Sequence, residues 1–260
     1  TIHVARGVYD EGCMSASDTK GFNRIVVPAG VRVVADEGRD VTVIEGAMAE
    51  PPDARIQNAG SGTNSLRVAF LRDNARMEGF TLRNGFAQAW EAEKGEYGGG
   101  VYAAKSSVVV DCTITNCHAV GAAAAYRAKL VNCAVVGNRS VYGYRVAVTD
   151  SDGIYGCSFK DTASDQGNQG HLTDVREIVN CTFDDSCPGM RLTTDVAVDV
   201  YNSIFLSDPI YSAGTGVICA FKNCILSRTP SASSEKYSLD GDCKVDASFA
   251  LGRDLSPLSE

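Results

Sequence analysis

A six-residue pattern that recurs about every 22 residues is the feature that most constrains this fold. One copy is Val-Val-Asp-Cys-Thr-Ile, which ends at Ile114, and another is Ile-Val-Asn-Cys-Thr-Phe, which ends at Phe183. The central position recurs at intervals of 21, 24, 24, 22 and 21 residues and holds Cys112, Cys133, Cys157, Cys181, Ser203 and Cys224. An earlier copy, residues 76–82, has Gly79 in the cysteine position. Self-similarity at such a period indicates a repeat architecture.

Each copy consists of apolar runs that are too short for a helix and are separated by small or polar residues. Such runs are typical of strands joined by tight bends. In one copy we expect strands at residues 100–103, 107–110 and 113–115, followed by a loop that opens at Asn116 or at its counterparts Asn138, Asp161, Asp185 and Asp208. The predicted fold is all-β: a single-stranded parallel β-helix, which is a solenoid of about ten coils of roughly 22 residues.

The coils account for the whole chain as a single domain, residues 1–260. We expect N-terminal coils over residues 1–85, an inserted loop over 86–97, regular coils over 98–229 and a closing segment over 230–260. The step from Gly79 to Cys112 is 33 residues, and the excess falls in the inserted loop, which carries the only tryptophan, Trp90. Trp90 either packs this loop onto the coil or stacks on a sugar ring.

The ten cysteines are expected to be mostly free thiols. The repeated cysteines should stack at an inner bend, about one strand spacing apart, which is wide for a disulfide. Five cysteines lie off this ladder and could pair: Cys13, Cys117, Cys187, Cys219 and Cys243. The chain has no CxxC motif and only three histidines, so we expect no cysteine-based metal site.

The net charge is −8, with 32 acidic and 24 basic residues. This balance argues against a nucleic-acid partner and against docking on anionic membranes. No apolar run approaches the roughly 20 residues that a transmembrane helix needs. The chain starts at Thr1 without a methionine, and we expect it to be an excised piece of a longer, processed protein.

Two motifs, Gly98-Gly99-Gly100-Val101-Tyr102 and Val131-Asn132-Cys133, carry a family resemblance. They resemble the right-handed parallel β-helix repeat proteins of the pectate-lyase-like superfamily, especially bacterial secreted or surface proteins with GGG-V-Y and L-x-N-C-T-I repeats. The opening residues 1–9 are similar to that family's first coil, with Arg6 in place of the usual proline, and residues 246–257 resemble its closing segment, with Ala247 in place of a proline. The resemblance implies a right-handed coil and a secreted or cell-surface location. It implies no particular activity, because the superfamily includes lyases, hydrolases, epimerases and adhesins.

In that superfamily, carbohydrate lies along the outer face of the first strand of successive coils. The corresponding positions here are predicted to be Tyr102, Tyr126, Arg145, His171 and Arg191, which are 24, 19, 26 and 20 residues apart. Tyrosine rings can pack on sugars and arginines can clamp carboxylates. His171, Arg191 and Arg145 are therefore the candidate catalytic residues of an acidic-polysaccharide lyase, and Tyr102, Tyr126 and Trp90 are the candidate substrate-binding residues. Alternatively, these positions are polar only because they face water.

Two further acidic groups have competing interpretations. Asp184 and Asp185 form either a hydrolase carboxylate pair or an ordinary loop opening. Asp150 and Asp152, with Asp174 in a neighbouring coil, could bind Ca²⁺, although Ser-Asp-Gly at 151–153 is also a common turn. No other cofactor is expected.

The leading hypothesis is an extracellular or cell-surface β-helix module of a larger bacterial protein, monomeric, which binds a polysaccharide or cell-surface glycan or has a structural role. The alternative hypothesis is a polysaccharide lyase, or less favourably a glycoside hydrolase, acting on acidic polysaccharide. Whether the chain is an enzyme is left open by the sequence.

Overall fold

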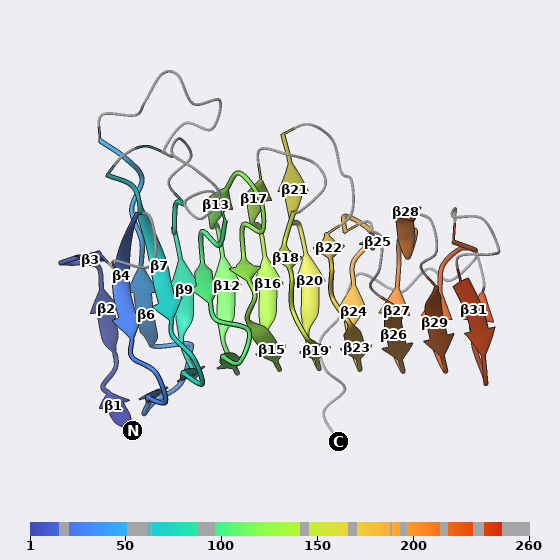
Figure 1. Ribbon diagram of the computed structural model, residues 1–260, viewed down its shortest axis with the longest axis horizontal. Helices are drawn as coiled ribbons and strands as arrows, with labels where there is room; N and C mark the ends of the chain where they lie inside the picture. Colours follow the sequence, from blue (N-terminus) through green and yellow to red (C-terminus); the bar gives the residue numbers. More distant parts are fainter. Residues whose placement is uncertain are drawn as a thin grey trace.

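The computed structural model describes residues 1–15, 21–50, 62, 64–87, 97–140, 146–165, 171–187, 189–192, 197–213, 218–230 and 237–245. Over these residues the chain is all-β and contains no helix. Three long, almost entirely parallel sheets, called A, B and C below, follow the long axis of the molecule from the first strands to the last (Figure 1). A fourth, three-stranded sheet consists of β13 (His118–Ala119), β17 (Arg139–Ser140) and β21 (Ala163–Ser164).

Sheets A and B each have ten described strands, which add to the sheet in chain order. Sheet A contains β1 (Ile2–Val4), β5 (Arg32–Ala35), β8 (Arg76–Glu78), β11 (Val108–Val110), β15 (Lys129–Val131), β19 (Ile154–Tyr155), β23 (Glu177–Val179), β26 (Val198–Tyr201), β29 (Cys219–Lys222) and β31 (Tyr237–Asp240). Sheet B contains β2 (Gly7–Tyr9), β6 (Thr42–Glu45), β9 (Thr81–Arg83), β12 (Thr113–Thr115), β16 (Ala134–Val136), β20 (Ser158–Lys160), β24 (Thr182–Phe183), β27 (Ile204–Phe205), β30 (Ile225–Leu226) and β32 (Lys244–Val245).

Sheet C has nine described strands. They are β3 (Met14–Ser15), β4 (Phe22–Val27), β7 (Leu66–Leu71), β10 (Val101–Ala103), β14 (Ala125–Tyr126), β18 (Val148–Thr149), β22 (Leu172–Thr173), β25 (Met190–Leu192) and β28 (Ile210–Ala213). Only β3 runs antiparallel to its neighbour, β4. From β4 to β30 the chain passes through sheets C, A and B in turn, so each strand pairs with its counterpart one repeat later.

The pairing confirms the strands expected within one repeat. β10, β11 and β12 lie at the three predicted places, and Ile114 of β12 pairs with Val135 of β16. The described strands at the end, β31 and β32, continue sheets A and B inside the segment expected to close the chain. The structure is all-β, and each repeat adds one strand to each of the long parallel sheets. This arrangement is compatible with the predicted parallel β-helix.

The core is a stack of equivalent apolar side chains. The inward residue of successive sheet B strands is at most 1% exposed at Ile114, Val135, Phe159, Phe183, Phe205 and Leu226. The rings of Phe159 and Phe183 stack at 4.8 Å, and those of Phe183 and Phe205 at 4.5 Å. Full burial of one such side chain contributes roughly 1.5–3 kcal/mol, so each coil is stabilised by the coils on both sides of it.

The repeated cysteines line the bend between sheets A and B, where their thiols serve as hydrogen-bond acceptors. The backbone N–H of Cys133 donates to Sγ of Cys157 at 3.3 Å, and that of Cys181 donates to Oγ of Ser203 at 3.1 Å. The acceptor at this position therefore satisfies a backbone N–H at the bend that has no partner in the sheets, which explains why serine can replace cysteine. All ten cysteines are free.

Two positions of this ladder differ from the sequence alignment. Phe80, and not Gly79, pairs with the cysteine position, because its N–H donates to Sγ of Cys112 at 3.4 Å. Cys243 was expected off the ladder, yet its Sγ accepts the N–H of Cys224 at 3.4 Å, so the ladder continues to Cys243.

The residue before each ladder position from Cys112 to Cys224 adopts a left-handed conformation. Its φ is 48° at Asp111, 53° at Asn132, 61° at Gly156 and 54° at Asn180. Glycine has no Cβ to clash in this region, and Asn and Asp tolerate it best among the other residues. This backbone requirement explains why Asn, Asp or Gly precedes every repeated cysteine.

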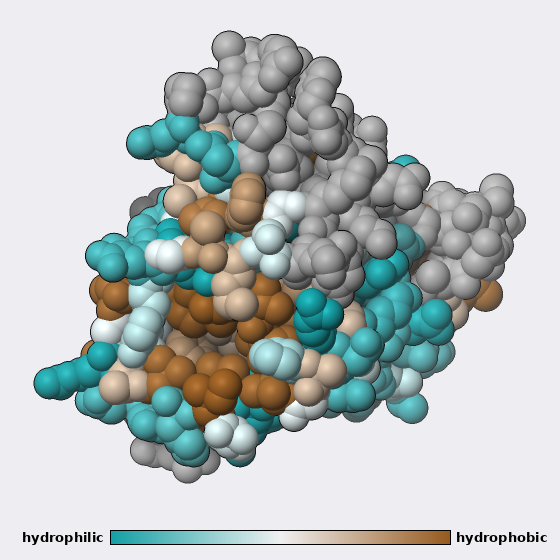
Figure 2. Space-filling view, turned by 60° about the vertical axis from the view of Figure 1, so that its left-hand side comes forward, coloured by the Kyte–Doolittle hydropathy of each residue, from teal (hydrophilic) through white to brown (hydrophobic). Residues whose placement is uncertain are grey.

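The end of the stack at the first strands exposes apolar side chains. Figure 2 shows a broad hydrophobic area on this side of the molecule. The exposed apolar residues of this region are Ile2, Val8, Met14, Phe22, Val41 and Met48. None of the described residues belongs to a helix that is long and apolar enough to cross a membrane.

Candidate functional site

The outer face of sheet C holds only part of the line predicted from the sequence. Tyr102 pairs with Tyr126, Tyr126 with Thr149, Thr149 with Thr173, and Thr173 with Arg191. Threonines thus occupy the two positions at which Arg145 and His171 were expected. Arg145 and Trp90 lie outside the described residues.

His171 does not face outward as the predicted line requires. It immediately precedes β22, between Ala147 and Gly189 of the neighbouring coils, to which its backbone is hydrogen-bonded. Its side chain is fully buried, and neither ring nitrogen has a hydrogen-bond partner. Burial lowers the pKa of the imidazole to about 3. A general base must reach the proton that it removes, and a buried imidazole cannot reach a polysaccharide.

Aromatic rings pack against one another on the outer face of sheet C. Ring centroids are 5.7 Å apart for Phe70 and Tyr102, 5.0 Å for Tyr102 and Tyr126, and 4.8 Å for Tyr97 and Tyr126. Tyr102 is only 6% exposed, and Tyr126 is half-buried with the ring of Tyr97 stacked on it. These tyrosines chiefly stabilise the face of the sheet, and they offer little free ring surface to a sugar.

A buried arginine borders this cluster. The side chain of Arg67 is inaccessible to solvent, its Nε donates to the carbonyl of Tyr97 at 2.9 Å, and its guanidinium lies over the ring of Tyr102. Burial lowers the pKa of Arg67 to about 10, which leaves the guanidinium charged at neutral pH. Arg67 thereby ties Tyr97 to the sheet.

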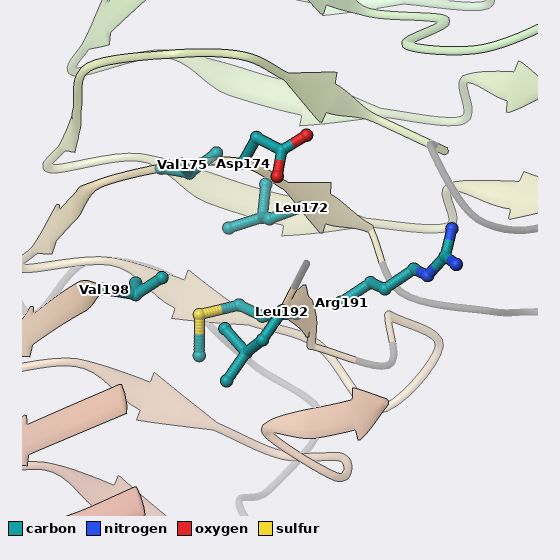
Figure 3. A pocket seen from close by; sticks show the side chains of 7 residues that line it. Leu172, Asp174, Val175, Arg191, Leu192 and Val198 are labelled. Atoms are coloured by element: carbon teal, nitrogen blue, oxygen red, sulfur yellow. The ribbon is translucent and has the colours of Figure 1, made fainter. Parts of the chain in front are cut away.

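Arg191 lies beside a narrow apolar gap. The gap is lined by Leu172, Val175, Met190, Leu192 and Val198, together with Asp174, and it admits no water molecule. Figure 3 shows Arg191 extending away from the apolar side chains of this gap. His171 is not among the residues that line this gap.

The acidic residues considered for catalysis or calcium have local partners. Oδ1 of Asp184 accepts hydrogen bonds from the N–H and Oγ of Ser186, at 2.9 and 3.0 Å, which is turn chemistry. Asp150 pairs with Lys105 at 2.6 Å and with Arg127 at 2.9 Å. No group of three or more His, Cys, Asp or Glu residues with metal-ligand geometry occurs among the described residues.

A groove of about 560 Å³ opens where sheet B ends at β6, β9 and β12. We call it the polar groove; its lining includes Glu45, Met48, Asn64, Asn84, Phe86 and Asn116. This volume is typical of small-molecule sites in proteins. Glu45 closes β6, while Asn84 and Asn116 directly follow β9 and β12 with φ values of 54° and 50°. The backbone bend at the end of sheet B therefore places amides side by side.

A hydrogen-bond network fixes the wall of the polar groove. Oε2 of Glu45 accepts from Nε and Nη2 of Arg83 at 2.9 and 2.7 Å, and its Oε1 accepts from Nδ2 of Asn84. Asn84 in turn accepts from Nδ2 of Asn116. Partial burial acts to raise the pKa of Glu45, but the bonds from Asn84 and Arg83 outweigh it and hold the pKa below its ordinary value. Glu45 is thus a carboxylate at neutral pH.

An aromatic stack supports the same groove. The rings of Phe86 and His118 are parallel within 2° and 4.5 Å apart, and Nε2 of His118 lies 3.4 Å from Oδ1 of Asn116. Sequence reasoning missed this site, apart from recognising Asn116 as a loop opening. The sequence did contain a signal for this site: Asn84 and Asn116 each directly follow the sheet B strand of their repeat, at equivalent positions of the repeated pattern.

No protein-family model matches the chain, and neither a curated protein nor a solved structure matches it.

Proposed function

We propose that this chain is a right-handed parallel β-helix of the pectate-lyase-like kind that acts as a non-catalytic glycan-binding module, secreted or on a cell surface. The observation that carries the proposal is the polar groove, in which amides and a carboxylate are held in place above an apolar ring. Planar polar side chains beside apolar carbon surface suit sugars, whose hydroxyls need hydrogen bonds and whose ring faces are apolar.

Binding is favoured over the alternative, a lyase acting on acidic polysaccharide. That reaction would use His171 or a tyrosine as base, with Arg145 and Arg191 stabilising the developing charge. Burial raises the pKa of Tyr126, so less of its phenol is ionised at neutral pH, which makes it a poorer base. A buried imidazole with a pKa of about 3 faces no substrate. The groove offers contacts to a ligand without needing any of these residues.

A glycan array probed with the labelled chain tests the proposal. We expect binding to at least one glycan, and loss of that binding in the double variant Asn84→Gly, Asn116→Gly, because glycine keeps the positive φ and removes both amides. The matched control is Asn132→Gly, Asn180→Gly, which makes the same change at two left-handed bends outside the groove. Equal loss in both double variants, or no binding by the unmodified chain, would refute the proposal.

A separate activity assay tests the lyase alternative. Incubation of the chain with acidic polysaccharides, with and without Ca²⁺, should give no rise in the ultraviolet absorbance of unsaturated uronates. A rise that the groove variant keeps would assign the activity to another surface and would show that the chain is an enzyme.

A further inference from the structure

The polar groove can both donate and accept hydrogen bonds. A carboxamide NH₂ carries two hydrogens, and Asn84 and Asn116 each use one of theirs within the wall. A carboxylate has about four acceptor sites, and Glu45 accepts three bonds from Arg83 and Asn84. Each of the three side chains therefore keeps bonding capacity for a ligand, two as donors and one as an acceptor.

The charge of the lining is negative. Glu45 and Glu50 both line the groove, and no lysine or arginine does so among the described residues. Arg83 approaches Glu45 from the neighbouring strand, and Arg24, whose Nε donates to the backbone carbonyl of Glu45 at 2.6 Å, adds a second positive charge near that carboxylate. Both arginines act on Glu45, which leaves Glu50 as the uncompensated negative charge of the lining. A ligand carboxylate brought into this space would meet like charge in a partly desolvated setting, which weakens binding.

We propose that the polar groove binds an uncharged, polyhydroxylated sugar unit and discriminates against uronates, a specificity that rests on the proposed glycan-binding function. A sugar hydroxyl both donates and accepts, and so matches the mixed wall. An ammonium ion only donates and would leave both amide donors unpaired, whereas a carboxylate only accepts and would leave the acceptor on Glu45 unpaired, each at a cost.

The wall is organised before a ligand arrives. Asn84 and Asn116 are held by backbone conformation and by each other. Asn84 is also bonded to Glu45 of the adjacent repeat, and Asn116 to His118, two residues further along the chain. Groups that are already fixed lose little conformational entropy on binding, which raises affinity and sharpens selection between similar ligands.

Isothermal titration of the chain with two sets of oligosaccharides tests this specificity. One set contains neutral gluco-, manno- and xylo-oligosaccharides, and the other contains galacturonate, glucuronate and alginate oligosaccharides. We expect the chain to bind at least one neutral member and to bind uronates at least about tenfold more weakly. Glu45→Gln, which keeps the shape but loses an acceptor and a charge, should weaken neutral binding about tenfold and narrow the gap to uronates.

Glu78→Gln is the matched control. Glu78 accepts hydrogen bonds from Arg32 and Arg76 and has the same 22% side-chain exposure as Glu45, but it lies on sheet A outside the groove. Its substitution should leave binding within about twofold of the unmodified chain.

The possible outcomes distinguish a failure of the proposed specificity from a failure of the proposed glycan binding. Uronate binding that is as tight as neutral binding and falls in Asn116→Gly would overturn the specificity and leave glycan binding intact. Absence of binding to both sets would overturn both. Equal weakening by Glu45→Gln and Glu78→Gln would also overturn the specificity, because the effect would then not belong to the groove.

Discussion

Acidification should destabilise the fold through His171, and the size of the effect follows from its burial. The imidazole is fully buried without a hydrogen-bond partner, and burial lowers its pKa from 6.5 to about 3. In the unfolded chain the ring takes up a proton near its ordinary pKa. Below pH 6.5 the unfolded state therefore binds more protons than the folded state, and the free energy of unfolding falls.

The magnitude depends on the pH interval. At pH 5, which is about 1.5 pH units below the pKa of His171 in the unfolded chain, only the unfolded state is protonated, and the free energy of unfolding is lower by about 2 kcal/mol. Near pH 3 the full difference of about 3.5 units is reached, which is about 5 kcal/mol, and it grows no further at lower pH. At pH 7 the contribution is close to zero because both states are neutral.

The comparison of His171→Ala with the unmodified chain isolates this contribution. Alanine already occupies the equivalent position in the preceding coil, at Ala147, so the backbone accepts it. Urea unfolding followed by circular dichroism at pH 7 and pH 5 gives the pH-dependent loss for each protein, and carboxylates contribute equally to both. We expect the unmodified chain to lose about 2 kcal/mol more than His171→Ala over this interval.

If His171→Ala loses as much stability between pH 7 and pH 5 as the unmodified chain does, then His171 is not buried in a dry, unpartnered site and the reasoning is wrong.

Three other predictions concern the bends and the thiols. Cys157→Ser should change the free energy of unfolding by less than about 1 kcal/mol, whereas Cys157→Ala should cost about 2 kcal/mol, because only alanine leaves the N–H of Cys133 without an acceptor; equal urea midpoints for the two variants would contradict this. Asn180→Ala should lower the free energy of unfolding by about 1 kcal/mol because alanine resists a φ of 54°, and Asn180→Gly should lower it less. A lower melting temperature for the glycine variant than for the alanine variant would show that φ is not the constraint. In the native chain, an aromatic disulfide reagent should label Cys13, the exposed thiol, far faster than the buried thiols of Cys112 and Cys157. Burial raises the pKa of Cys112; for Cys157 a bond to Cys133 acts to lower the pKa, but a bond to Cys181 and burial outweigh it and raise the pKa to about 12. Mass spectrometry that finds Cys112 and Cys157 labelled at the rate of Cys13 would refute this prediction.

The sequence predicts the regular part of this fold well because one physical requirement repeats in each coil. The bend needs a left-handed residue followed by a small acceptor, and the chain satisfies it with pairs such as Asn132-Cys133 and Asn180-Cys181. Strands on either side of such a pair follow directly. The misplacement of Gly79 shows the limit: the bend before Phe80 uses glycine for its φ of 79°, and an alignment on small residues shifts the copy by one.

The predicted outer line was wrong at its two middle positions for a different reason. It was built by counting residues across loops whose lengths vary, and such counting cannot fix which residue pairs with which. The pairing of Tyr126 with Thr149 and of Thr149 with Thr173 puts His171 two residues before the line. In a strand of two residues, a shift of that size moves a side chain from the sheet into the adjoining bend, where its neighbours Ala147 and Gly189 are small and buried space remains for a ring.

The polar groove was hidden from sequence reasoning because its residues have structural explanations of their own. Asn84 and Asn116 are what a left-handed bend requires, and Glu45 with Arg83 is an ordinary cross-strand ion pair. These residues form one side of the groove only because three consecutive repeats stack in register, so that each amide lies beside the acceptor of the preceding repeat. The residues that end the strands of sheet B thus supply the candidate ligand groups at no cost to the core, because their side chains lie outside it. Repeated parallel strands can in this way place candidate ligand groups on bend residues that every repeat needs, and the specific test is whether removing those amides abolishes binding while the same change at Asn132 and Asn180 does not.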